Sequence, residues 1–330
     1  MYDHYATPVA SGTWDVPATS AARFTWEYDG GRGRLLDLYQ RGKDKQWDAT
    51  KRIDWDLPVD PSNVMGISEE FTPIYGSRQW EVLSQPERDE LGNHLASWLF
   101  SQFLHGEQGA LTVAARIVES VPDMDSKFYA ATQAMDEARH VELFSRFVRD
   151  KIGLHYPINT DLGRLLADAL GDSRWDLPYL GMQVLIEGLA LRDYYRGLTQ
   201  AERADREEFV VEGCYLMRNR FRAQEVWERL GFDVAECMEF TEHSPVQQAF
   251  RTLLFSRIVP CVRDIGLWGP KVRHAYTDLG VIDAAKTDLE ALMRDDEEIA
   301  ERVDEEKHAA ELAARQGEVD AAIADGATTA

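Results

Sequence analysis

From residue 86 onward, apolar positions recur every three to four residues, which is the spacing of an amphipathic helix. The predicted helices lie at residues 87–121, 125–152, 175–198, 199–230, 245–267 and 283–315. Thr199, followed by Glu202, forms a capping box that opens the fourth helix, and Ser244-Pro245 opens the fifth, which we expect to bend or break at Pro260. No strong strand pattern competes after residue 85, so the sequence predicts an all-α protein.

Residues 1–85 have a mixed pattern with several prolines, and one further helix is predicted at 34–55. The "DGGRG" stretch at 29–33 lacks the third glycine of a dinucleotide-binding fingerprint and is interpreted as a turn. We therefore predict an N-terminal extension at 1–85, a helical bundle at 86–282, and an acidic C-terminal helix and tail at 283–330.

Three of the predicted helices carry a glutamate in the middle of an apolar stripe. Steps of three and four residues from Glu107, Glu137 and Glu187 reach almost only apolar side chains, and His140 follows Glu137 by three positions. Burying an unpaired carboxylate costs several kcal/mol, and converging carboxylates also repel one another. A metal cation among them would offset both costs, and oxygen ligands with one imidazole suit iron or manganese better than zinc.

Each of these signals also has an ordinary structural interpretation. A lone glutamate on an apolar stripe is usually ion-paired or extends to the surface, and a single Glu-x-x-His occurs often by chance. Three such glutamates on three successive long helices, one with its histidine, form a more specific pattern, because ferritin-like metal bundles use this arrangement. Trp98, Phe100, Phe103, Phe144 and Tyr194 are predicted to be packing residues.

The amino-acid composition argues against several kinds of partner and site. The 330 residues carry a formal charge of −22, so we expect neither a nucleic-acid partner nor an anionic membrane surface. The three cysteines are widely spaced and form no CxxC pair, which argues against a disulfide framework or a zinc ribbon. Without a secretory signal or a long apolar run, the expected location is cytoplasmic.

At "FLHGEQGAL", "KFYAATQAMDEARHVELF" and "YLGMQVLIEGLAL" the chain resembles the ferritin-like superfamily of bacterial di-iron proteins, such as di-iron oxygenases, N-oxygenases and the ribonucleotide reductase small subunit. The resemblance covers most of residues 34–280 and implies a ferritin-like bundle with additional C-terminal helices. It implies Glu107, Glu137, His140 and Glu187 as iron ligands, with Asp136 and Arg139 orienting them. It also implies two irons, oxidation of a small organic substrate with O₂, an external reductase or ferredoxin, and a homodimer.

The sequence departs from this family in one respect. Relatives carry a second D-E-x-R-H block downstream of the position that matches Glu187, and that block is missing here. Glu212 has Tyr215, not histidine, three positions later. The other Glu-x-x-His, formed by Glu305 and His308, lies in a segment that is charged on all sides, where a solvated face is expected.

Two functions from different classes follow from this ligand set. The first is a non-haem iron oxidoreductase, which would complete a second metal position with Glu212, with Glu305 and His308, or with another subunit. The second is a degenerate, metal-poor member that acts as a structural or partner subunit. A deletion in the gene, or an error in the gene sequence, is a third explanation for the missing block.

Overall fold

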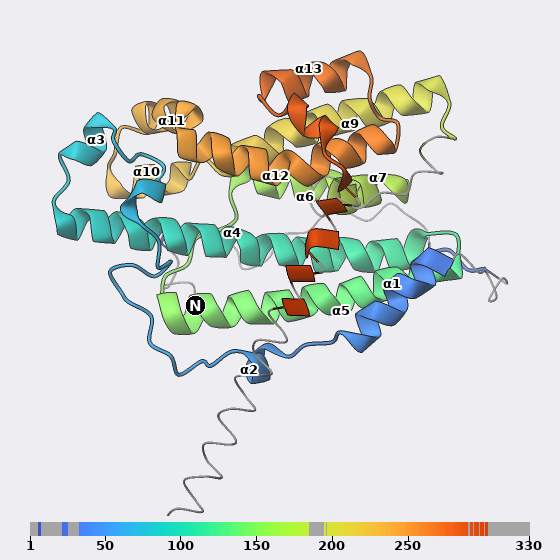
Figure 1. Cartoon of the computed structure of the whole chain (residues 1–330), viewed down its shortest axis with the longest axis horizontal. Coiled ribbons are helices and arrows are strands. Elements are labelled where there is room, and N and C mark those ends of the chain that lie inside the picture. Colours follow the sequence, from blue (N-terminus) through green and yellow to red (C-terminus); the bar gives the residue numbers. More distant parts are fainter. Residues whose placement is uncertain are drawn as a thin grey trace, which may run out of the picture. The chain divides into compact units, whose positions relative to one another are not determined.

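The computed structural model describes residues 6–7, 22–25, 33–184, 195, 197–289, 291–292, 294–296, 298–299 and 301–302. Within these residues the chain is helical and contains no sheet, so the predicted all-α class is confirmed (Figure 1). The chain divides into two compact units, residues 1–284 and 285–330. In the second unit the described residues between 289 and 302 are helical.

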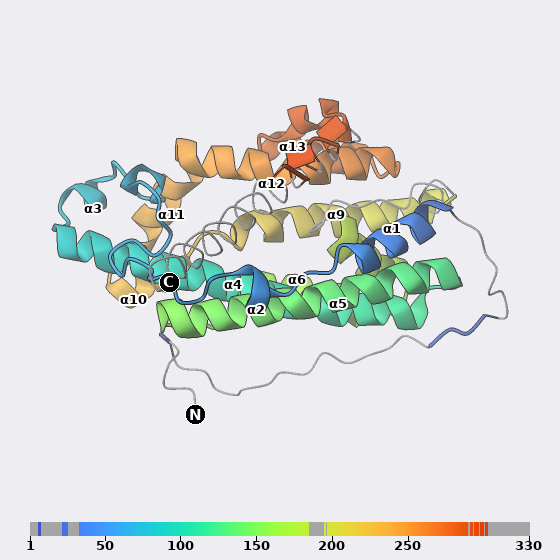
Figure 2. The ribbon, with the colours of Figure 1, turned by 60° about the horizontal axis from the view of Figure 1, so that its bottom comes forward.

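Two long neighbouring helices, α4 and α5, form the centre of the first unit. Helix α4 spans Gln85–Ser120 and begins with a capping box between Ser84 and Glu87. Helix α5 spans Met124–Phe147, and the Asp123 side chain accepts a hydrogen bond from the Ser126 amide at its start. Because only three residues separate these helices, they fold back on each other and lie side by side in both ribbon views (Figures 1 and 2).

The other helices pack on this pair or on one another. Helix α1 lies on α5 (Figure 2), α6 packs against both α4 and α9, and α13 packs on α9. Their bounds are α1 Gly33–Asp44, α2 Ala49–Arg52, η1 Glu69–Phe71, α3 Arg78–Glu81, η2 Val148–Ile152, α6 Thr160–Gly171, α7 Asp176–Tyr179, η3 Leu180–Val184, α9 Gln200–Asn219, α10 Gln224–Leu230, α11 Val234–His243, α12 Pro245–Asp264, α13 Pro270–Asp278 and η4 Ile282–Lys286.

The predicted single helix at 34–55 is wrong, because the chain breaks between α1 and α2. The Asp48 carboxylate accepts the amide hydrogen of Thr50 and starts a new helix there. Local side-chain bonding of this kind competes with helix continuation.

The predicted helix at 199–230 is also interrupted. Helix α9 ends at Asn219, and Ala223 adopts a left-handed φ of 51° before α10 begins. Side chains stabilise the break, since Asn159 donates to the Arg220 carbonyl and the Trp227 indole donates to the Arg222 carbonyl. Helix α12, in contrast, continues through Pro260, where a break was one of the two expected outcomes.

The fully buried face of α4 differs from the predicted apolar stripe. Gly109, Val113 and Ile117 are buried, whereas Phe103 and Leu111 of the predicted stripe are only half-buried. The backbone of α4 comes so close to α6 that a Cβ atom on Gly109 would lie 2.4 Å from a methyl carbon of Leu166. The stripe that contains Glu107 therefore lies beside the most tightly packed face of α4 and does not coincide with it.

A buried ion pair connects α7 to α9. The Arg206 guanidinium donates to both carboxylate oxygens of Asp176, at 2.9 and 3.1 Å, and both side chains are almost fully buried. The Tyr195 hydroxyl donates to the Asp176 carbonyl at 2.8 Å. Because both carboxylate oxygens accept a hydrogen bond from the guanidinium, this ion pair offsets the free energy cost of removing two charges from water.

Across the described part of the chain, no helix has both the length and the apolar character needed to span a bilayer.

Candidate metal centre

Three of the four predicted metal ligands converge between α4 and α5. Glu107 comes from α4, and Glu137 and His140 come from α5; one ligand atom of each lies within 4.8 Å of the other two. The His140 Nδ1 atom is 3.0 Å from Glu137 Oε2 and 3.2 Å from Glu107 Oε2. The spacing of three residues places Glu137 and His140 on one face of α5, and helix packing brings Glu107 to the same point.

The three side chains differ in their exposure to solvent. The exposed fraction is 6% for Glu137, 24% for Glu107 and 35% for His140. Burial raises the pKa of Glu137, and the neighbouring Glu107 acts in the same direction against the hydrogen bond from His140. Hydrogen bonds that His140 donates to the carboxylates of Glu107 and Glu137 raise the pKa of His140 to about 10.

This arrangement fits a divalent metal ion. Two carboxylates this close repel each other unless a positive charge lies beside them, and either protonated His140 or a metal ion bound to all three side chains can supply that charge. Two carboxylates and one imidazole are also the donor types that iron and manganese accept. Glu107, Glu137 and His140 therefore have the chemistry and the spacing of a metal site.

The other predicted candidates do not join this cluster in the described part of the chain. Glu212 lies on α9 with its carboxylate half exposed and accepts a hydrogen bond from Arg164. Glu187, Glu305 and His308 lie outside the described residues. Their assignment as ligands stays a prediction.

Arg139 occupies the α5 face next to the cluster. Its guanidinium pairs with Asp136 and donates to the Gln46 side chain. It also lies over the Trp47 ring, 5.6 Å from the ring centroid. The Trp47 ring in turn lies 5.8 Å from the His140 ring at an angle of 31°.

Gln46 and Trp47 are site neighbours that sequence reasoning missed. They lie between α1 and α2, in a segment interpreted as the interior of one helix. No local pattern distinguishes them, because their position on α5 depends on the break at Asp48. The Trp47 ring lies beside both His140 and Arg139, whereas the Gln46 side chain accepts a hydrogen bond from Arg139.

The aromatic residues near the cluster pack against one another. The Phe100 ring centroid lies 4.7 Å from that of Phe147, and the Phe103 ring centroid lies 5.7 Å from that of Phe144. The buried Trp98 indole donates to a Glu225 carboxylate oxygen at 2.9 Å. Tyr194 lies outside the described residues.

In ferritin-like carboxylate metal proteins, four core helices direct glutamates and Glu-x-x-His pairs to one point, and α4 and α5 contain part of this arrangement. Residues 32–170 match the family model described as p-aminobenzoate N-oxygenase AurF, a match that spans less than half of the 330 residues and contains Glu107, Glu137 and His140. The predicted resemblance to the ferritin-like di-iron oxygenases is confirmed over these residues. No curated protein and no solved structure matches the chain.

Proposed function

We propose that the protein is a non-haem iron oxygenase that oxidises a small organic substrate with O₂ at Glu107, Glu137 and His140. The observation that supports it is the convergence of these three ligand atoms within 4.8 Å of one another. Glu187 is proposed as a fourth ligand on the resemblance and on its apolar stripe. The description of the matched family names p-aminobenzoate and N-oxygenation, so an aromatic amine is the first substrate class to test.

In this proposal each protein group has a defined task. The carboxylates of Glu107 and Glu137 neutralise the metal charge, and His140 supplies the nitrogen ligand. Bound iron would supply the electrons and the binding position for O₂. Asp136, Gln46 and Trp47 hold Arg139 against α5, which keeps the helix face that presents Glu137 and His140 in place. An external reductase or ferredoxin would return electrons after each turnover.

The test is anaerobic loading with Fe(II), followed by iron quantification and an optical spectrum after exposure to oxygen. We expect fewer than two irons per chain in the wild type, because the relatives' second D-E-x-R-H block is missing. Glu137→Ala and His140→Ala should abolish iron binding, since each removes one ligand from a small set. Two irons per chain would show that other residues complete the second position.

Glu142→Ala is the matched control, because Glu142 lies on the same helix with its side chain exposed. His308→Ala is expected to leave iron binding unchanged. Iron binding that survives Glu137→Ala, or no iron binding by the wild type, would contradict the proposed function. With iron bound, the assay supplies p-aminobenzoate, O₂ and a reductant and follows the N-oxygenated product.

A further inference from the structure

A large groove lies in the first unit, lined by residues other than the three of the metal cluster. Its volume is about 890 Å³, which falls in the range of small-molecule sites. The lining residues come from two parts of the chain. The α4 side consists of residues 60–73, Trp80 and residues 85–99, and the α12 side consists of Phe221, Ala223 and residues 245–253.

The charged side chains of the described lining all belong to the α4 side. They are three carboxylates, Asp60, Glu69 and Asp89, and one guanidinium, Arg88. The α12 side contributes Gln247 as a polar group, and most of its other lining side chains are apolar. The groove is therefore apolar on one side and carries a net formal charge of −2 on the other.

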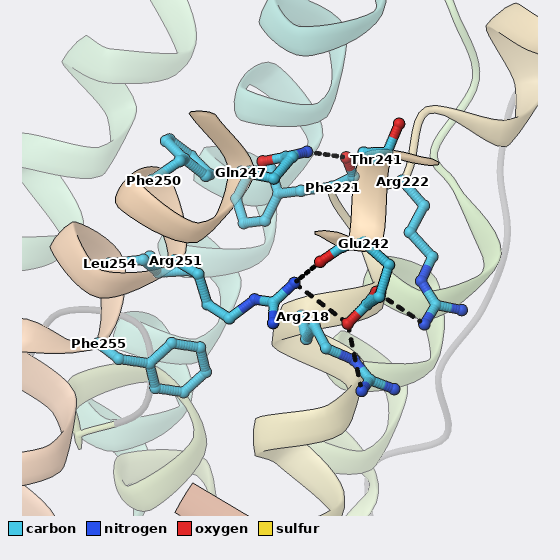
Figure 3. Close-up of a pocket in the computed structure, with 10 residues that line it drawn as sticks. All are labelled: Arg218, Phe221, Arg222, Thr241, Glu242, Gln247, Phe250, Arg251, Leu254 and Phe255. Carbon is cyan, nitrogen blue, oxygen red and sulfur yellow. Dashed lines mark hydrogen bonds and ion pairs between the residues drawn. The ribbon is translucent and has the colours of Figure 1, made fainter. Parts of the chain in front are cut away.

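The arginines close to the α12 side do not line this groove. They are Arg218, Arg222 and Arg251, and they surround the Glu242 carboxylate at a small cavity of their own (Figure 3). This cavity adjoins the groove at Phe250. Because Asp161 and Asp278 also interact electrostatically with these arginines, three carboxylates balance three guanidinium groups there.

The α4 side of the groove already holds one cation. The Arg88 guanidinium carbon lies 4.6 Å from the centroid of the Trp80 ring, and a guanidinium nitrogen lies 3.5 Å from a carboxylate oxygen of Glu69. An aromatic face and a carboxylate both attract an organic cation. The contacts of Arg88 therefore show that this side of the groove has the chemistry to bind a positively charged group.

The carboxylates outnumber this one cation. Glu69 and Asp89 lie close together, because the Gln85 side-chain amide donates a hydrogen bond of 2.9 Å to each of them. Gln85 is neutral and cancels none of their charge. Arg88 pairs with Glu69, whereas no cation of the described chain pairs with the half-buried Asp89. A second positive charge beside Asp89 would offset the repulsion between the two carboxylates.

Hydrogen bonds fix the segment that carries Asp60 and Glu69 to helix α4. Near its start, the Pro61 carbonyl accepts a hydrogen bond of 2.6 Å from the Asn93 side chain of α4. Near its end, Glu69 is held by Gln85 and Arg88 of the same helix. Because the segment is attached to α4 at two points, its carboxylates have defined positions in the groove.

Apolar side chains in the groove are exposed to solvent. The exposed fraction is 59% for Phe71, on the α4 side, and 71% for Leu253, on the α12 side. An occupant with an apolar body would bury part of this surface, which is favourable.

We propose that the groove binds an amphipathic organic cation, with its positive group beside Glu69 and Asp89 and its apolar body along the α12 side. The excess of carboxylates selects the charge of the head group, and the apolar side chains bind the body. The proposal is independent of iron binding, so failure of the metal site would not affect it.

Decyltrimethylammonium is the test probe, titrated calorimetrically below its micellar concentration into the full-length wild type. We expect saturable binding of one molecule per chain. Decanoate, with a tail of similar length and the opposite charge, should bind at least about tenfold more weakly. Hexyltrimethylammonium should also bind more weakly than the decyl probe, because it buries less apolar surface.

Two substitutions on the α4 side should change the affinity for the decyl cation in opposite directions. Asp89→Asn should weaken binding at least about threefold, because it removes a negative charge but leaves an oxygen that can accept the hydrogen bond from Gln85. Arg88→Met should strengthen binding about threefold, because it removes the competing positive charge and leaves an apolar side chain on Trp80.

Glu142→Gln is the matched control, since it removes one negative charge from an exposed position on α5 and should bind as the wild type does. Leu253→Ser tests the apolar body. It should weaken the binding of the cation and of decanoate by the same factor, because it removes apolar contact surface and leaves the charges of the groove unchanged.

Four results would overturn the proposal. The first two are no saturable binding of decyltrimethylammonium and equal affinity for the cation and for decanoate. The third is an equal loss of affinity in Asp89→Asn and Glu142→Gln, which would mean that the acidic chain as a whole attracts the probe. The fourth is weaker binding by Arg88→Met together with a lower melting temperature, which a purely structural role of these side chains predicts.

Discussion

His94 and Tyr156 share a hydrogen bond where α4 meets the segment that follows α5. The His94 Nδ1 atom lies 2.6 Å from the Tyr156 hydroxyl oxygen, and the tyrosine is fully buried. Burial raises the pKa of Tyr156, so its hydroxyl stays protonated at neutral pH. Burial also lowers the pKa of His94 below its ordinary value of 6.5.

This pair predicts a specific dependence of stability on pH. Because the folded state favours neutral His94, its contribution is fully present above about pH 6.5 and is lost as the pH falls through the lower folded-state pKa. The free energy of unfolding, measured with urea between about pH 7.5 and pH 5, should therefore fall less steeply in His94→Gln than in the wild type.

His243→Gln is the control for this measurement. His243 is exposed, with its Nδ1 atom 2.9 Å from the Glu239 carbonyl oxygen, so its removal should leave the pH profile close to that of the wild type. A His94→Gln profile that parallels the wild type would mean that His94 does not contribute to the acid sensitivity.

At the scale of elements, the contact between α4 and α6 depends on a missing side chain. Gly109→Ala would place a Cβ atom 2.4 and 2.6 Å from the two methyl carbons of Leu166, which is itself buried. Overpacking of this kind typically costs about 1–3 kcal/mol, and we expect a loss of unfolding free energy in that range. Urea denaturation at neutral pH measures it.

Gly106→Ala is the matched substitution on the same helix. Apart from the neighbouring residues and backbone of α4 itself, no atom lies within 4 Å of the position of the added Cβ, so the higher helix propensity of alanine should stabilise the protein by about 0.5–1 kcal/mol. Equal effects of the two substitutions would contradict the close approach of α4 and α6.

The sequence predicted the start of a helix where a local capping motif marks it, but it did not predict where a helix is interrupted. The start of α9 was predicted from the Thr199 capping box, which the structure contains. The breaks before Ala49 and after Asn219 were missed, because Asp48, Asn159 and Trp227 stabilise them through hydrogen bonds that are not visible as a change in periodicity.

At the scale of the whole molecule, a metal ion at Glu107, Glu137 and His140 would connect α4 to α5. A ligand that binds only the folded state stabilises it by about 2.7 kcal/mol at a concentration one hundred times its Kd. Anaerobic Fe(II) should therefore raise the melting temperature of the wild type, as measured by circular dichroism.

The control is the same titration with His140→Ala, where the increase should disappear. An equal increase in both proteins would show that iron binds elsewhere on this acidic chain. The melting temperature depends on folding and not on turnover. It therefore tests iron binding at the metal site even if the proposed substrate class is wrong.

The sequence by itself determined the helical class, the position of the long helices, and the shared face of Glu137 and His140. These features are local, since periodicity, caps and the spacing of three residues act within a few turns of one helix. Glu107 was also found from its apolar stripe, although that stripe is only partly buried.

Only the tertiary structure decided which distant side chains meet. The approach of Glu107 to α5 and the Trp47 ring beside His140 depend on how separate helices pack. The same holds for the arginines that pair with the Glu242 carboxylate (Figure 3), which are Arg218, Arg222 and Arg251. Apart from Glu242 and Arg251, which are nine positions apart, these partners are distant in the sequence. No periodicity within one helix records the partner that another helix brings to it. Packing geometry, acting on the whole chain at once, sets those distances and with them the chemistry available at each site.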